Sequence, residues 1–345
     1  MSAFTPKAAI VGIFLFPYSG RHRKARHGQD PSGIPGVWFD RCSHASCTIC
    51  RACGSVASEA GEIYRSLRPG CRRVFAERLQ ALWAHPVVVE NRPGGDSIVA
   101  NTAFLNANDD HTFLFAPAGN FAVHPFIYSK LPYDSTDLVP IARVSNTILA
   151  VAVKADSPYA TMKDFTEGAR KAPGQLNCAM VQGITEFTFW GYEAAEGLKI
   201  TQVPYRDITA SAVNLGEGRV DIVMLSCAMM QSQLQAGRIR TLVVNNATRA
   251  PVAPDVPTAR EAGYPSLEVE GLIGLFGIKS LSNELKQKIA VDVKTVSVDP
   301  AIPERLRATG QVVNYGGPND FTDAIAAQRA KIGATVKAID FKPKL

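Results

Sequence analysis

Short apolar runs alternate with amphipathic segments along the chain from residue 76 onward. The run Val87–Val89, which stops at Pro93-Gly94-Gly95, is typical of a strand buried on both faces that ends in a glycine turn. Segments with apolar residues three or four positions apart predict helices. The alternation predicts an α/β fold with mostly parallel sheets covered on both faces. The expected strands are 86–90, 111–116, 139–153, 176–181, 200–205, 220–225, 239–245, 268–278 and 311–315, and the expected helices are 76–83, 97–107, 161–171, 184–195, 210–215, 228–236, 282–296, 301–309 and a last helix whose buried face carries Phe321, Ile325, Ile332, Val336 and Ile339.

With 345 residues, the chain is long enough for two domains. The predicted strands cross between two sheets near residues 145–150 and return near 265–275. We therefore expect one lobe from residues 76–148 plus 272–345 and a second lobe from residues 149–271. Two crossing strands would act as a hinge, so the cleft between the lobes is the expected binding site.

The first 75 residues differ from the rest in charge and in periodicity. They hold 11 of the 37 Lys and Arg residues but only 4 of the 31 Asp and Glu residues, a balance of +7, whereas residues 76–345 carry −1. The body of the chain is therefore close to neutral and gives no indication of nucleic-acid binding. Residues 8–16 resemble the apolar core of a signal peptide only weakly, because no Ala-x-Ala site follows them.

Three interpretations of this N-terminal segment compete. Five of the seven cysteines lie in it, and the overlapping C-x-x-C spacings of Cys47, Cys50 and Cys53 suggest a zinc module, although no second pair of ligands follows at the usual distance. A basic tail for nucleic acid or a membrane is the second interpretation. The third, which we favour, is a disordered or mistranslated segment produced by a frame error or a misplaced start. The candidate zinc ligands are Cys42, His44, Cys47, Cys50 and Cys53.

The sequence offers little support for an enzyme. There is no G-x-S-x-G motif, no P-loop, and no G-x-G-x-x-G motif after a predicted strand. Histidine stops at His124, so the last 221 residues cannot supply it to a metal site or a Ser-His pair. Cys178 and Cys227 are the candidate nucleophiles of the body, but their strand settings favour small buried residues. We therefore expect no catalytic residues, no metal and no cofactor.

Six short motifs occur in a fixed order along the body of the chain. With them, residues 76–345 resemble the tripartite tricarboxylate transporter substrate-binding proteins, also called Bug receptors. The resemblance implies a type II periplasmic-binding-protein fold and the capture of a small carboxylate for membrane permease subunits. It also implies a periplasmic location, and we expect a monomer that binds no nucleic acid. The motifs are Val88–Gly95, Pro173–Asn177, Val203–Arg206, Gly218–Asp221, Gln235–Arg240 and Ala253–Thr258.

The resemblance further implies a ligand held between the lobes by loop amides, hydroxyls and bridging waters. Helix N-termini would supply donors to an anion without a full positive charge. For each loop a purely structural role competes with ligand contact, such as a turn at Gly119, a helix cap at Thr185 or a strand end at Ser226. The predicted ligand-binding residues are Gly119, Asn120, Gly183, Thr185, Tyr205, Asp207 and Ser226.

Two departures from the family pattern change the expectation. The family's first strand and its Pro-Gly-Gly anion loop should lie about 30 residues before Val87, and nothing there matches, so we expect the sheet to lack a central strand and the site to lack one wall. Asp207 stands where the family usually has glycine, and its carboxylate would repel an anion, which favours an amino-acid-like ligand over a tricarboxylate. A ligand-sensing regulator and a degenerate, non-functional receptor are the alternatives.

Overall fold

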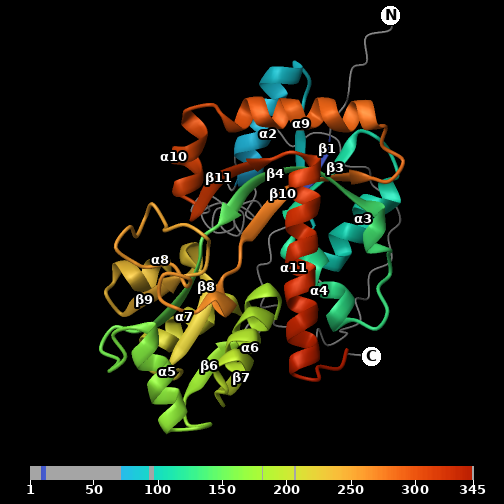
Figure 1. The fold of residues 1–345 in the computed structure, drawn as a ribbon. Helices are drawn as coiled ribbons and strands as arrows, with labels where there is room; N and C mark the ends of the chain where they lie inside the picture. Colours follow the sequence, from blue (N-terminus) through green and yellow to red (C-terminus); the bar gives the residue numbers. More distant parts are fainter. Residues whose placement is uncertain (1–8, 13–70, 93–96, 181, 206, 344–345) are drawn as a thin grey trace, which may run out of the picture. The chain divides into compact units, whose positions relative to one another are not determined.

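Two mixed β-sheets organise the chain (Figure 1). The computed structural model describes residues 9–12, 71–92, 97–180, 182–205 and 207–343. The six-stranded sheet has the order β11-β4-β10-β3-β1-β2 and the five-stranded sheet has the order β7-β6-β8-β5-β9. The first sheet contains β1 (Ala9–Gly12), β2 (Val88–Asn91), β3 (Thr112–Pro117), β4 (Leu138–Thr147), β10 (Gly271–Ile278) and β11 (Gln311–Gly316), and the second contains β5 (Leu149–Lys154), β6 (Asn177–Met180), β7 (Thr201–Pro204), β8 (Ile222–Ser226) and β9 (Ile239–Val244).

The helices follow the strands in chain order. Those associated with the first sheet are α2 (Cys71–Trp83), α3 (Ile98–Ala107), α4 (Gly119–Ile127), α9 (Asn283–Ser297), α10 (Ala301–Arg307) and α11 (Pro318–Ala338). Those between strands of the second sheet are α5 (Met162–Lys171), α6 (Ile184–Glu196), α7 (Ile208–Gly216) and α8 (Cys227–Gln235), and two short 3₁₀ turns, η2 (Ser135–Asp137) and η3 (Pro265–Leu267), precede β4 and β10. The α/β fold class is confirmed. Within the described residues, no helix is both long and apolar enough to cross a membrane.

The expectation of mostly parallel sheets was wrong in detail. β1 runs parallel to β2 and β3, and β6 runs parallel to β7 and β8. However, β10 pairs antiparallel with β3 and β4, and β5 pairs antiparallel with β8 and β9. The reason is the crossover: the chain leaves the first sheet through β4 and β5 and returns through β10 in the opposite direction, so the connecting strands meet antiparallel. The predicted lobe boundaries stay a prediction.

The first sheet does have its central strand, contrary to our expectation. Ala9–Gly12 forms β1 between β2 and β3, with Ala9 opposite both Val88 and Thr112. The prediction failed because we sought the strand about 30 residues before Val87, whereas parallel pairing does not fix the length of chain between two strands. The loop that would follow this strand, and the turn Pro93-Gly94-Gly95, lie outside the described residues.

Two helices also differ from the prediction. The helix α2 begins at Cys71 rather than residue 76, and Val74 and Phe75, each 1% exposed, belong to the core of the first sheet. The chain segment from Gly119, which we read as a loop, begins α4. Residues of the core therefore already occur just before the expected boundary at residue 75, and that boundary stays a prediction. The zinc, basic-tail and mistranslation interpretations concern the first 75 residues, of which residues 1–8 and 13–70 lie outside the described part.

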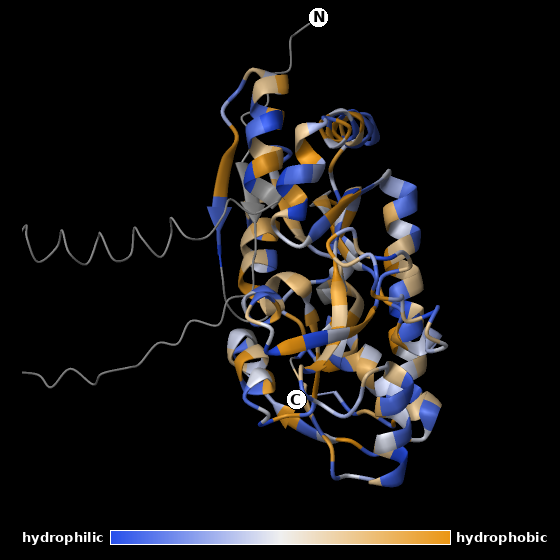
Figure 2. Cartoon of the chain, turned by 90° about the vertical axis from the view of Figure 1, so that its left-hand side faces the viewer, coloured by the Kyte–Doolittle hydropathy of each residue, from blue (hydrophilic) through white to orange (hydrophobic). Residues whose placement is uncertain are grey.

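Hydrophobic residues, orange in Figure 2, occur along the strands and alternate with hydrophilic residues along the helices, and the buried ones form clusters around each of the two sheets. Helix α5 shows how the sequence sets a boundary: Thr161 Oγ1 accepts a hydrogen bond from the Asp164 N–H at 3.1 Å, and the Asp164 carboxylate accepts one from the Thr161 N–H at 2.8 Å. These two reciprocal hydrogen bonds form a capping box at the start of α5. At the start of α3, Ser97 has φ 74° and makes no side-chain cap hydrogen bond, and Asp96 lies outside the described residues.

Helix α11 connects the helices of the two sheets. It packs against both α4 and α6. A Cβ atom at Gly191 of α6 would lie 2.8 Å from Thr335 Oγ1 of α11, so the two helices approach closely at a glycine. Val123, Phe187 and Ile332 from α4, α6 and α11 are buried together in one apolar cluster. This cluster fixes the N-terminal half of α6 relative to α4.

Candidate functional site

The loops predicted to bind ligand lie at one edge of the second sheet. β6, β7 and β8 are adjacent and parallel, so their carboxyl ends meet at the same edge. Each is followed by a helix, and the N-cap residues of α6, α7 and α8 are Gly183, Asp207 and Ser226. Ligands of open α/β sheets bind at this edge, outside the carboxyl ends of the strands. The structure therefore brings three of the predicted residues to one sheet edge.

Gly183 starts α6 in a conformation that only glycine adopts readily, with φ 133° and ψ −155°. A Cβ atom there would meet nothing within 4 Å, so the backbone conformation and not crowding calls for glycine. No side chain caps this helix at Gly183. Thr185 is the second residue of α6 and is half-buried. The first turn of a helix attracts anions through its N–H groups and its dipole.

Asp207 has a structural partner at the start of α7. Its carboxylate accepts hydrogen bonds from the N–H groups of Thr209 at 2.8 Å and Ala210 at 3.4 Å. The α7 N-terminus therefore already stabilises the negative charge of this carboxylate. The charge repulsion that the sequence suggested is reduced by that capping. The role of Asp207 in contacting a ligand stays a prediction.

Tyr205 lies at the end of β7 and is held by two hydrogen bonds. Its N–H donates to the Met180 carbonyl at 2.9 Å, and its hydroxyl accepts from Asn214 Nδ2 at 2.8 Å. The ring packs against the apolar cluster under α7 and α8. These contacts give Tyr205 a structural role at the end of β7. Its contact with a ligand stays a prediction.

Ser226 ends β8 and caps α8. Its Oγ accepts a long hydrogen bond, 3.4 Å, from the Met229 N–H. The hydroxyl proton is not used by that bond and can be donated to another acceptor. The next N–H, that of Cys227, donates to the Ile148 carbonyl at 2.9 Å, which ties the start of α8 to the crossover between the sheets.

Gly119, which follows strand β3 of the first sheet, lies close to the helix starts at the edge of the second sheet. It starts α4 directly after β3, and a Cβ atom there would lie 3.3 Å from Cβ and Cγ2 of Ile184, the first residue of α6. The preceding N–H, that of Ala118, donates to the Leu272 carbonyl at 2.8 Å. The N-terminal ends of α4 and α6 are therefore in contact. The side chain of Asn120 lies outside the described part.

A polar cluster at the crossover was missed by the sequence analysis. The Glu270 carboxylate accepts hydrogen bonds from Asn146 Nδ2 at 2.5 Å, Asn246 Nδ2 at 2.9 Å and the Ala247 N–H at 2.8 Å. Asn246 also accepts from the Leu149 N–H at 2.9 Å. One carboxylate thus joins the ends of β4, β9 and the segment entering β10. Only the fold unites these residues, because Asn146 and Glu270 are 124 positions apart.

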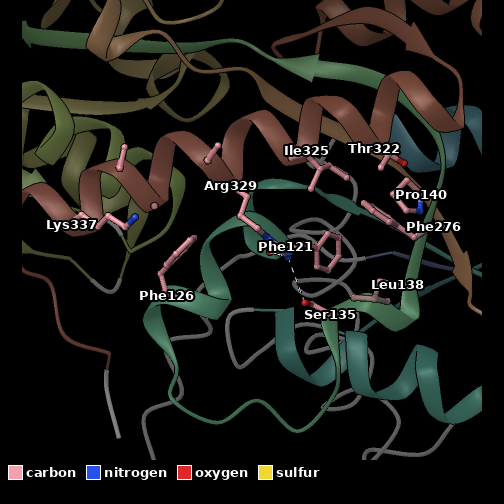
Figure 3. Close-up of a pocket in the computed structure, with 14 residues that line it drawn as sticks. Phe121, Phe126, Ser135, Leu138, Pro140, Phe276, Thr322, Ile325, Arg329 and Lys337 are labelled. Atoms are coloured by element: carbon pink, nitrogen blue, oxygen red, sulfur yellow. Dashed lines mark hydrogen bonds between the residues drawn. The ribbon is translucent and has the colours of Figure 1, made fainter.

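Two cavities lie near these elements. One of about 250 Å³ is lined by Ile184 and Thr188 of α6 together with Leu272, Glu270 and residues of α11. A larger one of about 750 Å³ lies between α4 and α11 (Figure 3). Neither is lined by any of the seven predicted ligand-binding residues. The predicted contacts with a ligand therefore stay a prediction.

Cys178 and Cys227 are unsuited to nucleophilic attack. Cys178 is 0% exposed, and burial raises the pKa of its thiol well above the usual range. Burial also raises the pKa of the Cys227 thiol to about 11. A thiol is nucleophilic as its thiolate, which these surroundings disfavour at neutral pH.

Comparison with known proteins identifies the relatives of this chain. The sequence model of the family described as "Tripartite tricarboxylate transporter family receptor" matches residues 71–341. A curated relative, the UPF0065 protein in the tcbD-tcbE intergenic region of Pseudomonas sp. strain P51, is 28% identical over 261 residues, which cover 74% of this chain and 77% of the relative.

Solved structures show the same fold. One titled "Structure of a periplasmic transporter" is 25% identical with a TM-score of 0.68. The match covers 79% of this chain and 92% of the chain in that structure. A second, "R. palustris Rpa4515 with adipate", is 24% identical with a TM-score of 0.70. The match covers 79% of this chain and 93% of the chain in that structure. Since the family match spans most of the sequence, the chain belongs to the tripartite tricarboxylate transporter receptor family.

Proposed function

We propose that this protein is an extracytoplasmic receptor that captures a small carboxylate and delivers it to the permease subunits of a tripartite tricarboxylate-type transporter. The observation that carries the proposal is the convergence of helix N-termini: α6 and α8 start at one edge of the second sheet, and Gly119 at the start of α4 contacts Ile184 at the start of α6. The family match and the adipate bound to a structural relative support the same ligand class.

Helix ends can hold a carboxylate without a cationic side chain. The N-terminus of a helix carries roughly half a positive charge and presents N–H groups that have no partner within the helix. In this proposal the amides of the first turn of α6 bind one carboxylate group, and the Ser226 hydroxyl donates to the ligand while its Oγ continues to cap α8. Asp207 leaves α7 unsuited to a second anion, because its own carboxylate occupies that helix end.

The class of carboxylate depends on Asp207. Its charge is partly satisfied by the amides of α7, which allows a ligand that carries carboxylates alone. A ligand with an ammonium group would still gain from a nearby carboxylate. We therefore keep small carboxylates as the proposed ligands and make amino-acid-like ligands a defined outcome of the binding experiment. In this proposal the receptor is periplasmic, acts as a monomer, and performs no turnover.

The experiment is a binding screen with the full chain by thermal shift and calorimetry. The panel contains adipate, malate, citrate, glutamate and a neutral diamide of adipate. A carboxylate at 100 times its dissociation constant should add about 2.7 kcal/mol to the free energy of unfolding, and the diamide should add nothing. Tighter binding of glutamate than of the others would identify an amino-acid-like ligand. The absence of saturable binding by every acid would contradict the proposal and favour a degenerate receptor, and salt-dependent binding of duplex DNA would favour a regulator.

A matched pair of variants tests the location of the site. Ser226→Ala removes the cap of α8 at the proposed site. Ser282→Ala removes the equivalent cap of α9, where Ser282 Oγ accepts a hydrogen bond from the Leu285 N–H at 3.2 Å. Each should lower the free energy of unfolding by about 1 kcal/mol. Only Ser226→Ala should weaken carboxylate binding, by roughly tenfold, which is the affinity of one hydrogen bond to a charged group. Equal affinities of the two variants would exclude Ser226 from the site.

A further inference from the structure

The cavity between α4 and α11 is a second candidate binding site that the proposed function does not use. Its volume is about 750 Å³, which lies within the usual range for small-molecule sites. Its walls come from α4, η2, β4, β10 and α11, which are elements of the first sheet and its helices. It is therefore separate from the helix ends of α6, α7 and α8.

The walls of this cavity are largely apolar. Phe121 and Phe126 of α4 face it from one side, and Phe276, Leu138 and Ile325 close one end (Figure 3). The Phe121 and Phe276 rings are fixed edge to face, with centroids 4.6 Å apart. Rigid rings of this kind favour an apolar ligand body, because little side-chain freedom is lost when it binds.

Small residues on α11 keep the cavity open. Ala326, Ala330 and Ala334 line it at intervals of four residues, so they share one face of the helix. All three are exposed to solvent. At Gly333 a Cβ atom would lie 3.3 Å from Phe126 Cζ, so this ring packs directly on the helix backbone. Larger residues on this face would fill the space between α4 and α11.

The charges that line the cavity have one sign. Arg329 and Lys337 of α11 are cationic, and no Asp or Glu side chain of the described residues lines the cavity. Arg329 reaches across it, as Figure 3 shows, and its Nη2 donates to the Phe121 carbonyl at 3.0 Å and to Ser135 Oγ at 3.5 Å. Its Nε is buried and has no hydrogen-bond partner within the described part of the chain. The guanidinium is thus held in place through Nη2, while its Nε is left without a partner among the described residues.

We propose that this cavity binds an organic monoanion with an apolar body, such as a medium-chain carboxylate. The carboxylate group binds Arg329, whose planar guanidinium suits that geometry, and the apolar body lies against Phe121 and Phe126. Lys337 lies eight residues along the same helix, about 12 Å away, and adds favourable potential at the other end. A charged ligand without an apolar body lacks the contacts with Phe121 and Phe126. An apolar ligand without a charge lacks the ion pair with Arg329.

Calorimetry with decanoate as the probe, on the full chain, tests this proposal. Decanol and butyrate are the matched ligands that lack the charge or the apolar body. We expect one saturable decanoate site and at least tenfold weaker binding of both others. Equal affinity for decanol, or no decanoate binding at millimolar concentration, would overturn the proposal. Displacement of decanoate by a carboxylate that binds the proposed receptor site would also overturn it, because the probe would then occupy that other site.

Two kinds of variant locate the decanoate. Ala330→Trp should fill the cavity and abolish binding, whereas Ala338→Trp, at an exposed position of α11 outside the cavity, should leave it unchanged. Arg329→Gln should weaken binding at least tenfold, and Arg307→Gln on the exposed surface of α10 should not. Unchanged decanoate binding in both Ala330→Trp and Arg329→Gln would refute the site. Binding of the adipate, malate, citrate and glutamate panel, measured on the same variants, tests the proposed receptor function separately.

Discussion

Glu193 offers a sharp test of how burial shapes this fold. It lies on α6 with 9% of its surface exposed, and its carboxylate accepts hydrogen bonds from the Ile200 N–H at 3.2 Å and from Gln202 Nε2 at 2.9 Å. Neither partner is cationic. Burial therefore dominates over the two hydrogen bonds and raises the pKa of the Glu193 carboxyl from its ordinary value of 4.5 to about 7.

The sign of the effect follows from proton binding. Between pH 4.5 and pH 7 the folded protein keeps a proton on Glu193 that the unfolded chain has released, so stability falls as the pH rises through this window. Above the folded pKa the loss is complete. At about 1.4 kcal/mol per pH unit, over roughly 2.5 units, the ionisation of Glu193 lowers the free energy of unfolding by at most about 3.5 kcal/mol.

The perturbation is Glu193→Gln, which removes the charge and keeps the shape. The Gln oxygen can accept from the Ile200 N–H, and the Gln202 amide can turn to present its oxygen. We expect the variant to match the wild type near pH 5 and to be about 2–3 kcal/mol more stable at pH 8. Urea unfolding followed by circular dichroism at each pH measures this, with Glu167→Gln on the exposed face of α5 as the control for net charge. A variant that keeps the wild-type pH dependence, or that is less stable at pH 8, would refute the reasoning.

Three further predictions concern single positions. Gly183→Ala should lower the free energy of unfolding by about 1–3 kcal/mol, because φ 133° is unfavourable for alanine. An unchanged midpoint of urea unfolding would show that alanine adopts this backbone conformation without strain. Glu270→Ala should cost about 3 kcal/mol, since it leaves the buried Asn146 amide and other donors without an acceptor, whereas Glu270→Gln should cost less in the same assay. Thr161→Ala should cost about 1 kcal/mol through loss of the α5 capping box, and a Thr161→Ser variant should recover most of it.

Local signals predicted most elements of the fold. Helix α5 was predicted from its amphipathic period, and the strands of the second sheet were predicted from short apolar runs. Helix α4 was missed because its first residue, Gly119, and Pro125 in its interior are of types that usually interrupt helices. Strand β1 was missed because four apolar residues carry little pattern, and its place between β2 and β3 is set by pairing with distant strands.

The candidate site was only partly accessible to the same reasoning. Gly183, Asp207 and Ser226 follow predicted strands, so the sequence could place them at helix starts on one sheet edge. The contact of Gly119 with Ile184 depends on how the helices of the two sheets pack, which no local pattern encodes. The Glu270 cluster depends on crossing strands that meet only in the folded chain.

The central claim is that helix N-termini at the edge of the second sheet hold a carboxylate. A crystal structure of the protein with the tightest-binding carboxylate of the panel tests it most directly. The account predicts a carboxylate group within hydrogen-bond distance of the first-turn amides of α6 and of the Ser226 hydroxyl, with Gly119 beside it. A ligand bound elsewhere, with these groups facing solvent, would contradict the account.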